Sequence, residues 1–378
     1  MASTRTVHTI QTPAVLIDTA RLARNIDTMQ RAADAAGFLL RPHAKTHKLP
    51  AIAKQQIARG AVGICCAKPS EAMVFAEAGI EDIRIPYPVH PSKSDPILAL
   101  MDRTRLSIIV DDADVATAWA GVMAGAGRTL NVLVKVDVGF HRCGIDPVSP
   151  EGPHLVSLVA NLPGLKLCGI LSHAGHGYHA DSETALKLIA EEEVNVMTRL
   201  AAHMRHKGVE VKEISVGATP TARFSLKHKG PTEMRPGNYV YFDRTQVGLG
   251  AATVDDCALT VLSTVVTKHP GRIILDAGSK TLTNDGARGF SPLAGYGALS
   301  PSPDARLQPH DGFSIERLSE EHATVKVAGG APALNIGDRV RILPNHSCVV
   351  SNLVDVVHMV DGDRVVESLP VAARGRIL

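Results

Sequence analysis

A cluster of cationic side chains follows a short apolar pair near the start of the chain, in the stretch Leu39-Leu40-Arg41-Pro42-His43-Ala44-Lys45-Thr46-His47-Lys48. Pro42 favours an extended backbone before it and cannot donate to a sheet, so we expect Lys45 to follow a short strand. Neighbouring cations disfavour the ammonium form of a lysine, and a neutral amine can attack an aldehyde to form a Schiff base. These residues could equally form a solvated basic turn, and the rest of the chain decides between the two interpretations.

Two later turns combine small residues with hydroxyl or guanidinium groups. Residues 215–221 place Gly217 and Thr219 after a predicted strand, where backbone N–H groups could approach a phosphate closely. The second turn is Arg235-Pro236-Gly237-Asn238-Tyr239. An arginine stays charged, so Arg235 beside a pyridine nitrogen would keep that nitrogen unprotonated. Small turn residues are common, and neither turn identifies a phosphate site by itself.

An imidazole and a thiol lie close together in Leu343-Pro344-Asn345-His346-Ser347-Cys348. On an extended segment, His346 and Cys348 would project to the same side and could form half of a metal site with open positions. A thiolate ligand favours zinc over magnesium. The alternative is a buried cysteine beside an ordinary turn histidine.

The elements that must position these residues alternate between strand and helix. Strands are predicted at residues 15–18, 39–40, 63–66, 83–85, 107–111, 131–137, 167–172, 213–216 and 239–242, and helices at 19–36, 50–59, 70–79, 112–125, 150–160 and 182–207. This regular alternation favours a parallel (β/α)8 TIM-type barrel over a doubly wound sheet. In such a barrel, chemistry sits at the carboxyl ends of the strands. The residues that follow predicted strands are Lys45, Arg142, His173, Tyr178 and Thr219.

The pattern changes near residue 250, where short β-branched segments separated by Gly, Pro and Asp begin. It predicts a C-terminal all-β domain with strands at residues 259–267, 272–276, 323–327, 339–343 and 354–360. We therefore expect a barrel over residues 21–250 and a β domain over 251–378. The loop at 280–314 is long and rich in Gly, Ser and Pro, which is typical of functional or mobile loops.

The totals exclude several classes of protein. A net charge of +2 and 3% aromatic residues argue against nucleic-acid binding and attraction to a membrane surface. The 6 cysteines contain no CxxC pair and match no disulfide or four-ligand zinc framework. We expect no membrane span and, because no apolar segment follows Met1, no secretory leader, so a cytoplasmic location is the natural interpretation.

Taken together, these motifs resemble the fold-type III pyridoxal-phosphate enzymes, whose best-known member is alanine racemase. Within them the chain is most similar to the D-threonine aldolase/D-serine dehydratase group. The matching segments are residues 41–45, 136–144, 172–176, 215–221, 235–237, 276–278 and 372–375. The similarity covers almost the whole chain, from about Thr12 to Arg374, and several ordered motifs are more specific than any one.

The resemblance implies that Lys45 holds pyridoxal 5′-phosphate, with Arg235 at its ring nitrogen. The residues it implies around the phosphate are Gly217, Thr219, Gly237, Asn238 and Tyr239. It also implies an eight-stranded barrel, a β domain joined by residues 1–20, and a homodimer with active sites near the subunit interface.

Four further residues have two interpretations each. The resemblance puts Arg142 near the 3-oxygen of the cofactor, although it could form a structural ion pair. His173, Tyr178 and His176 are candidates to pack on the ring, hold its 3-hydroxyl or move protons. A histidine at a strand end could instead cap a backbone carbonyl.

Two motifs divide the group by reaction. His346-Ser347-Cys348 and Ser215-Val216-Gly217-Ala218-Thr219 look like the dehydratase branch, whereas aldolases tend to have His-x-Asp and GGGTG. The closing Ala-Arg-Gly and the Val-Asp-Val-Gly segment also occur among aldolases.

The resemblance thus implies a dehydratase of D-3-hydroxy amino acids such as D-serine, D-threonine or D-threo-3-hydroxyaspartate, giving a 2-keto acid and ammonia. Lys45 would be the base, and a divalent metal (zinc, or else manganese or magnesium) would lie on His346 and Cys348. The alternative is retro-aldol cleavage to glycine and an aldehyde. A racemase would need a second acid–base group, usually a tyrosine of the β domain, and no tyrosine follows Tyr296.

Overall fold

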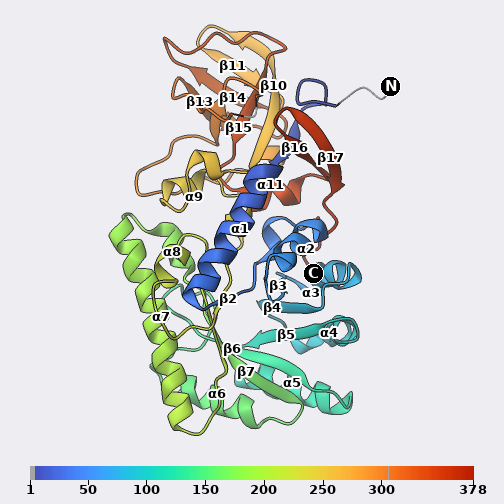
Figure 1. Cartoon of the computed structure of the whole chain (residues 1–378), viewed down its shortest axis with the longest axis vertical. Coiled ribbons are helices and arrows are strands. Elements are labelled where there is room, and N and C mark those ends of the chain that lie inside the picture. Colours follow the sequence, from blue (N-terminus) through green and yellow to red (C-terminus); the bar gives the residue numbers. More distant parts are fainter. Residues whose placement is uncertain (1–4, 305) are drawn as a thin grey trace.

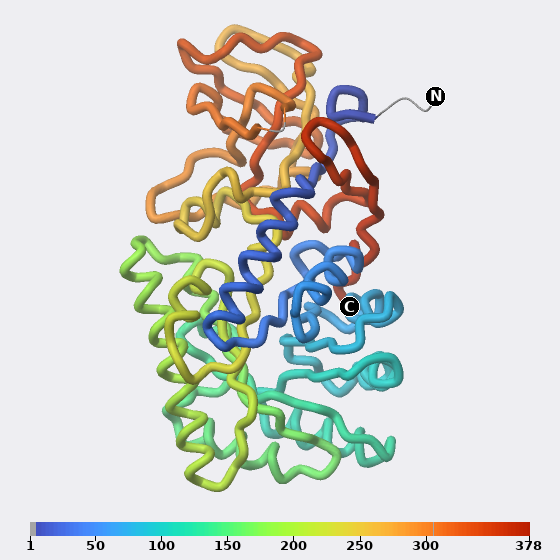
Figure 2. The backbone as a smooth tube through the Cα atoms, in the orientation of Figure 1, coloured from blue at the N-terminus to red at the C-terminus, as the bar shows by residue number. Residues whose placement is uncertain are grey.

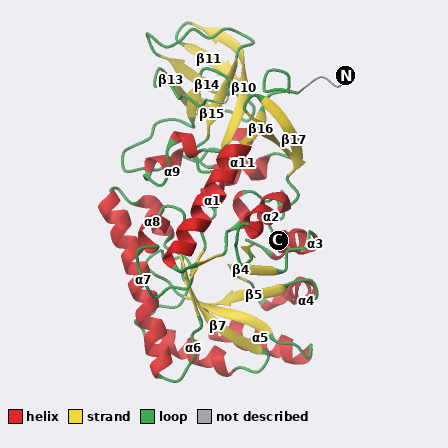
Figure 3. Cartoon of the chain, in the orientation of Figure 1, coloured by secondary structure: helices red, strands yellow, loops and turns green. Residues whose placement is uncertain are grey.

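A computed structural model describes residues 5–304 and 306–378, which form two units (Figure 1). A barrel surrounded by helices occupies the lower part of the view, and a domain built mainly of strands lies above it (Figure 3). Residues 1–4, on which the expectation about a leader partly depends, and residue 305 of the predicted 280–314 loop lie outside the described residues.

The barrel is an eight-stranded parallel sheet in which each strand pairs with the next along the chain. Its strands are β2 (Leu39–Leu40), β3 (Ile64–Cys65), β4 (Asp82–Pro88), β5 (Arg105–Val110), β6 (Leu130–Lys135), β7 (Leu165–Leu171), β8 (Glu213–Val216) and β9 (Glu233–Met234). β2 pairs with β9, and a parallel bridge between His43 and Cys65 joins its other side to β3. The sheet therefore closes, which confirms the predicted TIM-type barrel.

One predicted strand is wrong. Residues 239–242 are not a strand, because the chain there begins with the 3₁₀ turn η4 (Asn238–Val240) directly after Pro236 and Gly237. The eighth strand is instead β9, a pair of residues between β2 and β8. The residue pattern did not indicate β9, because Glu233 points its charged side chain into the barrel, where an apolar residue is expected.

The helices that follow the strands form the outer layer (Figure 3). Their bounds are α1 (Thr19–Ala36), α2 (Pro50–Ala58), α3 (Pro69–Glu77), α4 (Ser94–Met101), α5 (Ala113–Gly125), α6 (Glu151–Asn161), α7 (Glu183–His206) and α8 (Ala222–Ser225). Three short helices lie after the barrel strands in the chain: α9 (Arg244–Gly248), α10 (Ser279–Leu282) and α11 (Ser347–Leu353). The ends of α1 have local causes: Asp18 accepts the N–H of Arg21 at 2.9 Å, and Gly37 adopts φ 77° after the last turn. No helix that the structure describes is long and apolar enough for a membrane crossing.

The β domain is a nine-stranded sheet in which β1 lies between β10 and β16. Its strands are β1 (Ala14–Asp18), β10 (Leu259–His269), β11 (Arg272–Leu275), β12 (Ala298–Ser300), β13 (Phe313–Leu318), β14 (Ala323–Val327), β15 (Arg339–Leu343), β16 (Val356–Asp361) and β17 (Arg364–Pro370). The sequence did not predict β12, β13 and β17, and α10, β12 and part of β13 fall within the predicted loop at 280–314. Val15 of β1 lies opposite Val261 in an antiparallel pair and Val357 in a parallel one.

The two units pack against each other through α1 and the turn after β9. Leu22 and Ile26 of α1 belong to the same buried apolar cluster as Val261 and Val357 of the β domain, and Tyr241 joins it from the barrel side. The tube view follows α1 as it leaves the β domain and descends along the barrel (Figure 2). This packing holds the β domain near the turns that follow the barrel strands.

Candidate active site

One cavity of about 290 Å³ collects most of the residues that the sequence singled out. Those that line it are Lys45, Arg142, His173, Tyr178, Thr219, Arg235, Gly237, Asn238, His346 and Cys348. The first eight follow barrel strands and the last two belong to the β domain, so the cavity lies where the two units meet. His176, Gly217 and Tyr239 are not among its lining residues.

Lys45 lies in the 3₁₀ turn η1 (Ala44–Thr46), directly after β2. The Nδ1 atom of His43 accepts the backbone N–H of Lys45 at 3.4 Å and so caps the turn. The Lys45 amine is exposed in the cavity and forms no ion pair with any residue that the structure describes. Nothing in the described part of the chain occupies the amine, so it fits a group that reacts with an aldehyde.

The two small-residue turns form a wall of the cavity with free backbone donors. Among the described residues, the N–H groups of Thr219, Gly237 and Asn238 have no hydrogen-bond acceptor. Gly217 lies behind this wall at φ 102°, where a side chain would overlap the sulfur of Met234. Unpaired N–H groups beside a tight glycine turn fit a phosphate.

The tyrosine predicted in the second turn faces away from the cavity. The Tyr239 hydroxyl accepts a hydrogen bond from Gln56 of α2 at 2.9 Å, and the side chain is fully buried. Its backbone N–H donates to the hydroxyl of Thr219 at 3.2 Å. Tyr239 therefore supports the phosphate turn from behind, and its assignment as a cofactor-binding residue stays a prediction.

Arg235 is held in place by a buried polar network that fills the barrel. Its Nε atom donates to the Ser215 hydroxyl at 2.6 Å, and that hydroxyl donates to Glu233 at 2.5 Å. Glu233 also accepts a hydrogen bond from Arg41 at 2.7 Å. Burial lowers the pKa of Arg235, yet a guanidinium remains charged at neutral pH. The network fixes the direction from which this charge faces the cavity.

Glu193 of α7 connects two catalytic-site turns from behind. Its Oε1 atom accepts from the Ser172 hydroxyl at 2.7 Å and from the N–H of Ala174 at 3.1 Å. The same atom accepts the N–H of Gly217 at 3.3 Å. One buried carboxylate thus sets the position of His173 relative to the phosphate turn.

The histidines after β7 differ in position. His173 lines the cavity, and burial followed by the charge of Lys135 holds its pKa well below the usual range, so the imidazole is neutral. His176 instead stacks on Phe140, with ring centroids 6.5 Å apart. The guanidinium of Arg142 lies 5.1 Å from the same ring, so the predicted structural ion pair does not form among the described residues.

The sequence analysis missed Lys135, which ends β6 and lines the cavity. Burial, followed by the nearby charge of Arg235, lowers the pKa of Lys135 to about 7. A lysine at the carboxyl end of an apolar strand was the available signal. Lys135 adds a cation next to Arg142 and Arg235 that can lose its proton near neutral pH.

His346 and Cys348 lie at the start of α11 rather than on an extended segment. His346 is the residue before the helix, and Cys348 is in its first turn. Burial alone would lower the pKa of His346, but its hydrogen bond with Cys348 and the charge of that thiolate raise it to about 10. The same contact outweighs burial at Cys348 and lowers the pKa of its thiol. The two side chains therefore stabilise each other's charged forms, an imidazolium beside a thiolate.

Further residues surround this pair. The hydroxyl of Thr46 and the amide of Asn238 lie 3.2 and 3.4 Å from the Cys348 sulfur. Asp285 Oδ2 lies 2.6 Å from His346 Nδ1, so Nε2 is the ring nitrogen on the side of Cys348 and the one that a cation could use. A carboxylate behind a histidine is the usual support of a metal ligand. Sequence reasoning missed Asp285, because the two residues are 61 positions apart.

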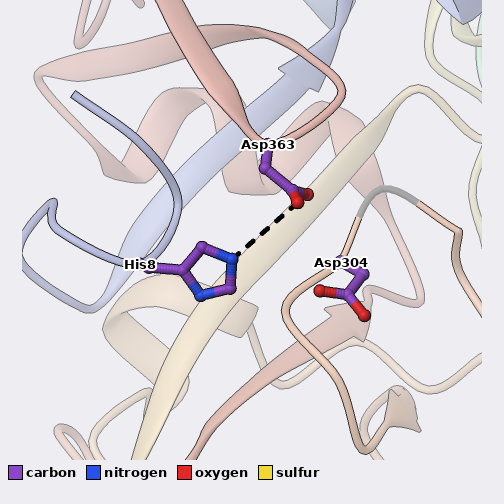
Figure 4. Close-up of side chains that lie close together, drawn as sticks. All are labelled: His8, Asp304 and Asp363. Atoms are coloured by element: carbon purple, nitrogen blue, oxygen red, sulfur yellow. Dashed lines mark ion pairs between the residues drawn. The ribbon is translucent and has the colours of Figure 1, made fainter. Parts of the chain in front are cut away.

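A second group of possible ligands lies elsewhere, at His8, Asp304 and Asp363 (Figure 4). His8 and Asp304 are exposed, and a guanidinium nitrogen of Arg341 donates to the Asp304 carbonyl at 3.2 Å. His8 and Asp363 form an ion pair at 3.8 Å. A neighbouring cation and exposure to solvent make this cluster a poor metal site, and none of its residues lines the cavity.

Comparisons with known proteins match both units. Residues 17–245 match the family model described as "Alanine racemase, N-terminal domain", and residues 258–360 match "Putative serine dehydratase domain". D-threo-3-hydroxyaspartate dehydratase of Delftia sp. is 36% identical over 91% of this chain and 92% of that protein. D-threonine aldolase of Arthrobacter sp. is 33% identical over 97% of this chain and 93% of that protein.

Solved structures show similarity to the same families. The Delftia dehydratase superposes with a TM-score of 0.89 and 34% identity, covering 97% of this chain and 98% of that one. The D-threonine aldolase of Filomicrobium marinum gives 0.88 and 30% identity, with 100% of both chains covered. Alanine racemase of Clostridium difficile, at 14% identity and a TM-score of 0.71 over 96% of this chain and 99% of that one, shares the fold alone.

Proposed function

The chain belongs to the fold-type III pyridoxal-phosphate enzymes, in the family of D-serine dehydratases and D-threonine aldolases, and from this premise we propose that it dehydrates D-3-hydroxy amino acids. The substrate would lose its Cα proton and its β-hydroxyl, and the resulting enamine would hydrolyse to a 2-keto acid and ammonia. One observation carries this proposal: Lys45, the two phosphate-type turns and the His346–Cys348 pair line a single cavity.

The residues present fit the cofactor. Lys45 would hold its aldehyde carbon, the N–H groups of Thr219, Gly237 and Asn238 its phosphate, and Arg235 its ring nitrogen. Pyridoxal phosphate, when bound, supplies an electron sink for the negative charge that develops at Cα. Because the guanidinium stays protonated, Arg235 would donate to the ring nitrogen and leave it without a proton of its own.

The protein residues then direct the proton transfers. Lys45 Nζ would accept the Cα proton from one face of the substrate only, and this would set selectivity for one enantiomer. Neutral His173 and the Tyr178 hydroxyl line the same cavity and are placed to hold a proton near the reacting atoms. His176 and Phe140 form the ring stack behind His173.

The residues present also fit a divalent cation, held by His346 and Cys348 with Asp285 behind the imidazole. Such a cation, when bound, supplies Lewis-acid assistance to the departure of the β-hydroxyl. Zinc is the cation we propose, because one ligand is a thiolate. Solved structures of the related dehydratase offer support, because they include a cysteine-to-alanine mutant in a metal-free form and a histidine-to-alanine mutant two positions earlier.

Retro-aldol cleavage is the second candidate, because the aldolase of Arthrobacter sp. is 33% identical over 97% of this chain. Against it, His346-Ser347-Cys348 resembles the dehydratase motif.

We further infer a homodimer from the family resemblance, which light scattering on the purified protein would test. We place the protein in the cytoplasm, because Cys65, Cys66, Cys143, Cys168, Cys257 and Cys348 are all free thiols.

The deciding experiment incubates the protein, loaded with pyridoxal phosphate and Zn²⁺, with D-serine, D-threonine and D-threo-3-hydroxyaspartate. We expect 2-keto acid and ammonia in equal amounts, and none from the L-enantiomers. Glycine and an aldehyde without ammonia would show that the chain is an aldolase. Equilibration of D- and L-alanine without either product would instead show a racemase.

A further inference from the structure

Arg288 lines the active-site cavity from the β-domain side, in the loop between α10 and β12. Its backbone N–H donates to the Thr245 hydroxyl at 3.2 Å, and the N–H of Phe290 donates to the Gly248 carbonyl at 3.0 Å. Both acceptors belong to α9, so this short helix holds the loop at Arg288 and just after it. The backbone from which the Arg288 side chain extends is therefore fixed to the cavity wall.

The Arg288 side chain is exposed and forms no hydrogen bond or ion pair with any residue that the structure describes. The two aspartates of the cavity are already engaged. Asp285, in the same loop, pairs with His346 at 2.6 Å, and Asp243 accepts the N–H of Ser347 at 2.9 Å. Arg288 thus presents a positive charge that no described carboxylate neutralises.

Gln246 of α9 places a buried amide on the same side of the cavity, and the residue is 1% exposed. The Tyr178 hydroxyl faces this amide and contacts it, and it also lies within the electrostatic reach of Arg288. An amide has one acceptor oxygen and two N–H donors, so the contact with Tyr178 leaves hydrogen-bonding capacity that no other described residue takes up. Buried amides are almost always satisfied, so this remaining capacity in a binding cavity indicates a polar ligand.

The cavity lining has more positive than negative side chains, so an anion would be stabilised there. Its lining contains five lysine or arginine residues (Lys45, Lys135, Arg142, Arg235 and Arg288) and two aspartates (Asp243 and Asp285). In the proposed function the cofactor phosphate lies on the turns after β8 and β9. The α-carboxylate of the substrate is one further negative charge. The barrel side holds two cations, Lys135 and Arg142, for this carboxylate and for the 3-oxygen of the cofactor, beside which the family resemblance puts Arg142. Arg288 is left without an anion of its own.

We propose that Arg288, assisted by the amide of Gln246, binds a carboxylate on the side chain of the substrate. A guanidinium binds a carboxylate through two parallel hydrogen bonds, which makes the pair specific as well as strong. The preferred substrates are then D-3-hydroxy amino acids with a second carboxylate, of which D-threo-3-hydroxyaspartate is one, over D-serine and D-threonine. This inference rests on the proposed function and narrows its substrate class.

The test compares kcat/KM for D-threo-3-hydroxyaspartate with kcat/KM for D-serine in the holoenzyme and in Arg288→Gln. We expect the ratio of the two values to fall on the order of 10- to 100-fold in the variant, because a binding site for a charged group discriminates strongly against substrates that lack it. Gln246→Leu should lower the ratio in the same direction by less. The matched control, Arg317→Gln on exposed β13, should leave the ratio unchanged.

A ratio that stays the same in Arg288→Gln would overturn the inference. An equal loss for both substrates would overturn it as well, since Arg288 would then hold the α-carboxylate or a structural contact. Because the Arg288 side chain is exposed, Arg288→Gln should fold as the wild type does. Its circular dichroism and its cofactor absorption should therefore match those of the wild type, and a difference in either would reveal a folding defect.

A binding measurement separates this inference from the proposed function. D-aspartate and D-alanine differ by the side-chain carboxylate, and neither has a β-hydroxyl to eliminate. We expect D-aspartate to bind the holoenzyme more tightly than D-alanine, by calorimetry, and this preference to disappear in Arg288→Gln. If no substrate yields a keto acid but the preference is present and lost in the variant, the dehydratase proposal fails and the carboxylate site stands. If the wild type shows no preference, the carboxylate site fails whatever the reaction.

Discussion

The hydroxyl oxygen of Thr46 lies 3.2 Å from the sulfur of Cys348, although the two residues are 302 positions apart. Thr46 follows Lys45 in the same turn, and Cys348 is in the first turn of α11. The turn that presents the amine therefore touches the helix that presents the thiol. The distance between the base and the proposed cation is fixed by direct contact between the two units.

Lys45→Ala should remove the Schiff-base absorption of protein reconstituted with pyridoxal phosphate, because no other amine follows β2 into the cavity. Turnover of D-serine should fall to background. Lys54→Ala, on an exposed position of α2, serves as the control and should keep both properties. Absorption that persists in Lys45→Ala would mean that another lysine holds the aldehyde. Lys135, which also lines the cavity, would be the first candidate.

Asp285→Asn should weaken Zn²⁺ binding roughly 10- to 100-fold, because the carboxylate orients His346 and makes its free nitrogen a better ligand. Competition with a chelator measures this loss, and cofactor absorption should not change. Asp304→Asn is the control, and it also tests the cluster of Figure 4. A cation lost in Asp304→Asn and retained in Asp285→Asn would place the metal at that cluster instead.

Gly217→Ala should raise the dissociation constant of pyridoxal phosphate about tenfold or more. The left-handed φ of 102° strains a residue with a side chain by about 1–3 kcal/mol, and the new methyl group would press against Met234. Titration of the apo-protein followed by absorption measures the change. Gly329 has open space around it and no positive φ, so Gly329→Ala should bind the cofactor as the wild type does.

Glu233 should make the protein lose stability in acid. Burial acts to raise its pKa, but Arg84 and Arg41 outweigh burial and lower it from 4.5 to about 2. The folded state then binds a proton less readily than the unfolded state. Stability from this group is thus complete above about pH 4.5 and is lost as pH falls towards 2, by a few kcal/mol in all.

Urea unfolding between pH 6 and 2.5 or so measures this loss, and Glu233→Gln isolates it. The variant should be less stable at neutral pH, because two buried guanidinium groups lose a partner, and its stability should depend less on pH. Glu316→Gln, at an exposed ion pair, should keep the steep wild-type profile. An unchanged slope in Glu233→Gln would assign the acid sensitivity to other carboxylates.

Much of the fold could be predicted from local sequence, because its causes are local. Asp18 and Gly37 mark the ends of α1, and the glycine-containing turns after strands mark the places where the cavity forms. Glu233 shows where this reasoning stops: its charge is paired inside the barrel with Arg41 and Arg84, which come from other strands. The pattern of residues 233–234 gives no hint of those partners, so β9 was overlooked.

In the candidate site, too, residues with local sequence signals could be predicted, and residues that depend on distant partners could not. Lys45, Arg235 and the His346–Cys348 pair could be proposed from residue type and spacing, together with the family resemblance. Asp285, Gln246 and Arg288 could not, because each becomes significant only through a residue brought close by the junction of the two units. The direction of the Tyr239 side chain could not be predicted for a related reason, since only the packing of α2 near η4 brings Gln56 to its hydroxyl.

The position of β1 in its sheet has a consequence for synthesis of the chain. β1 leaves the ribosome well before its neighbours β10 and β16, which begin at residues 259 and 356. At a translation rate of about 5–20 residues per second, the apolar side chains of β1 remain without their neighbouring strands for tens of seconds. During that time they are available to chaperones and to other nascent chains, and the β domain is complete only after β16 and β17 have been synthesised.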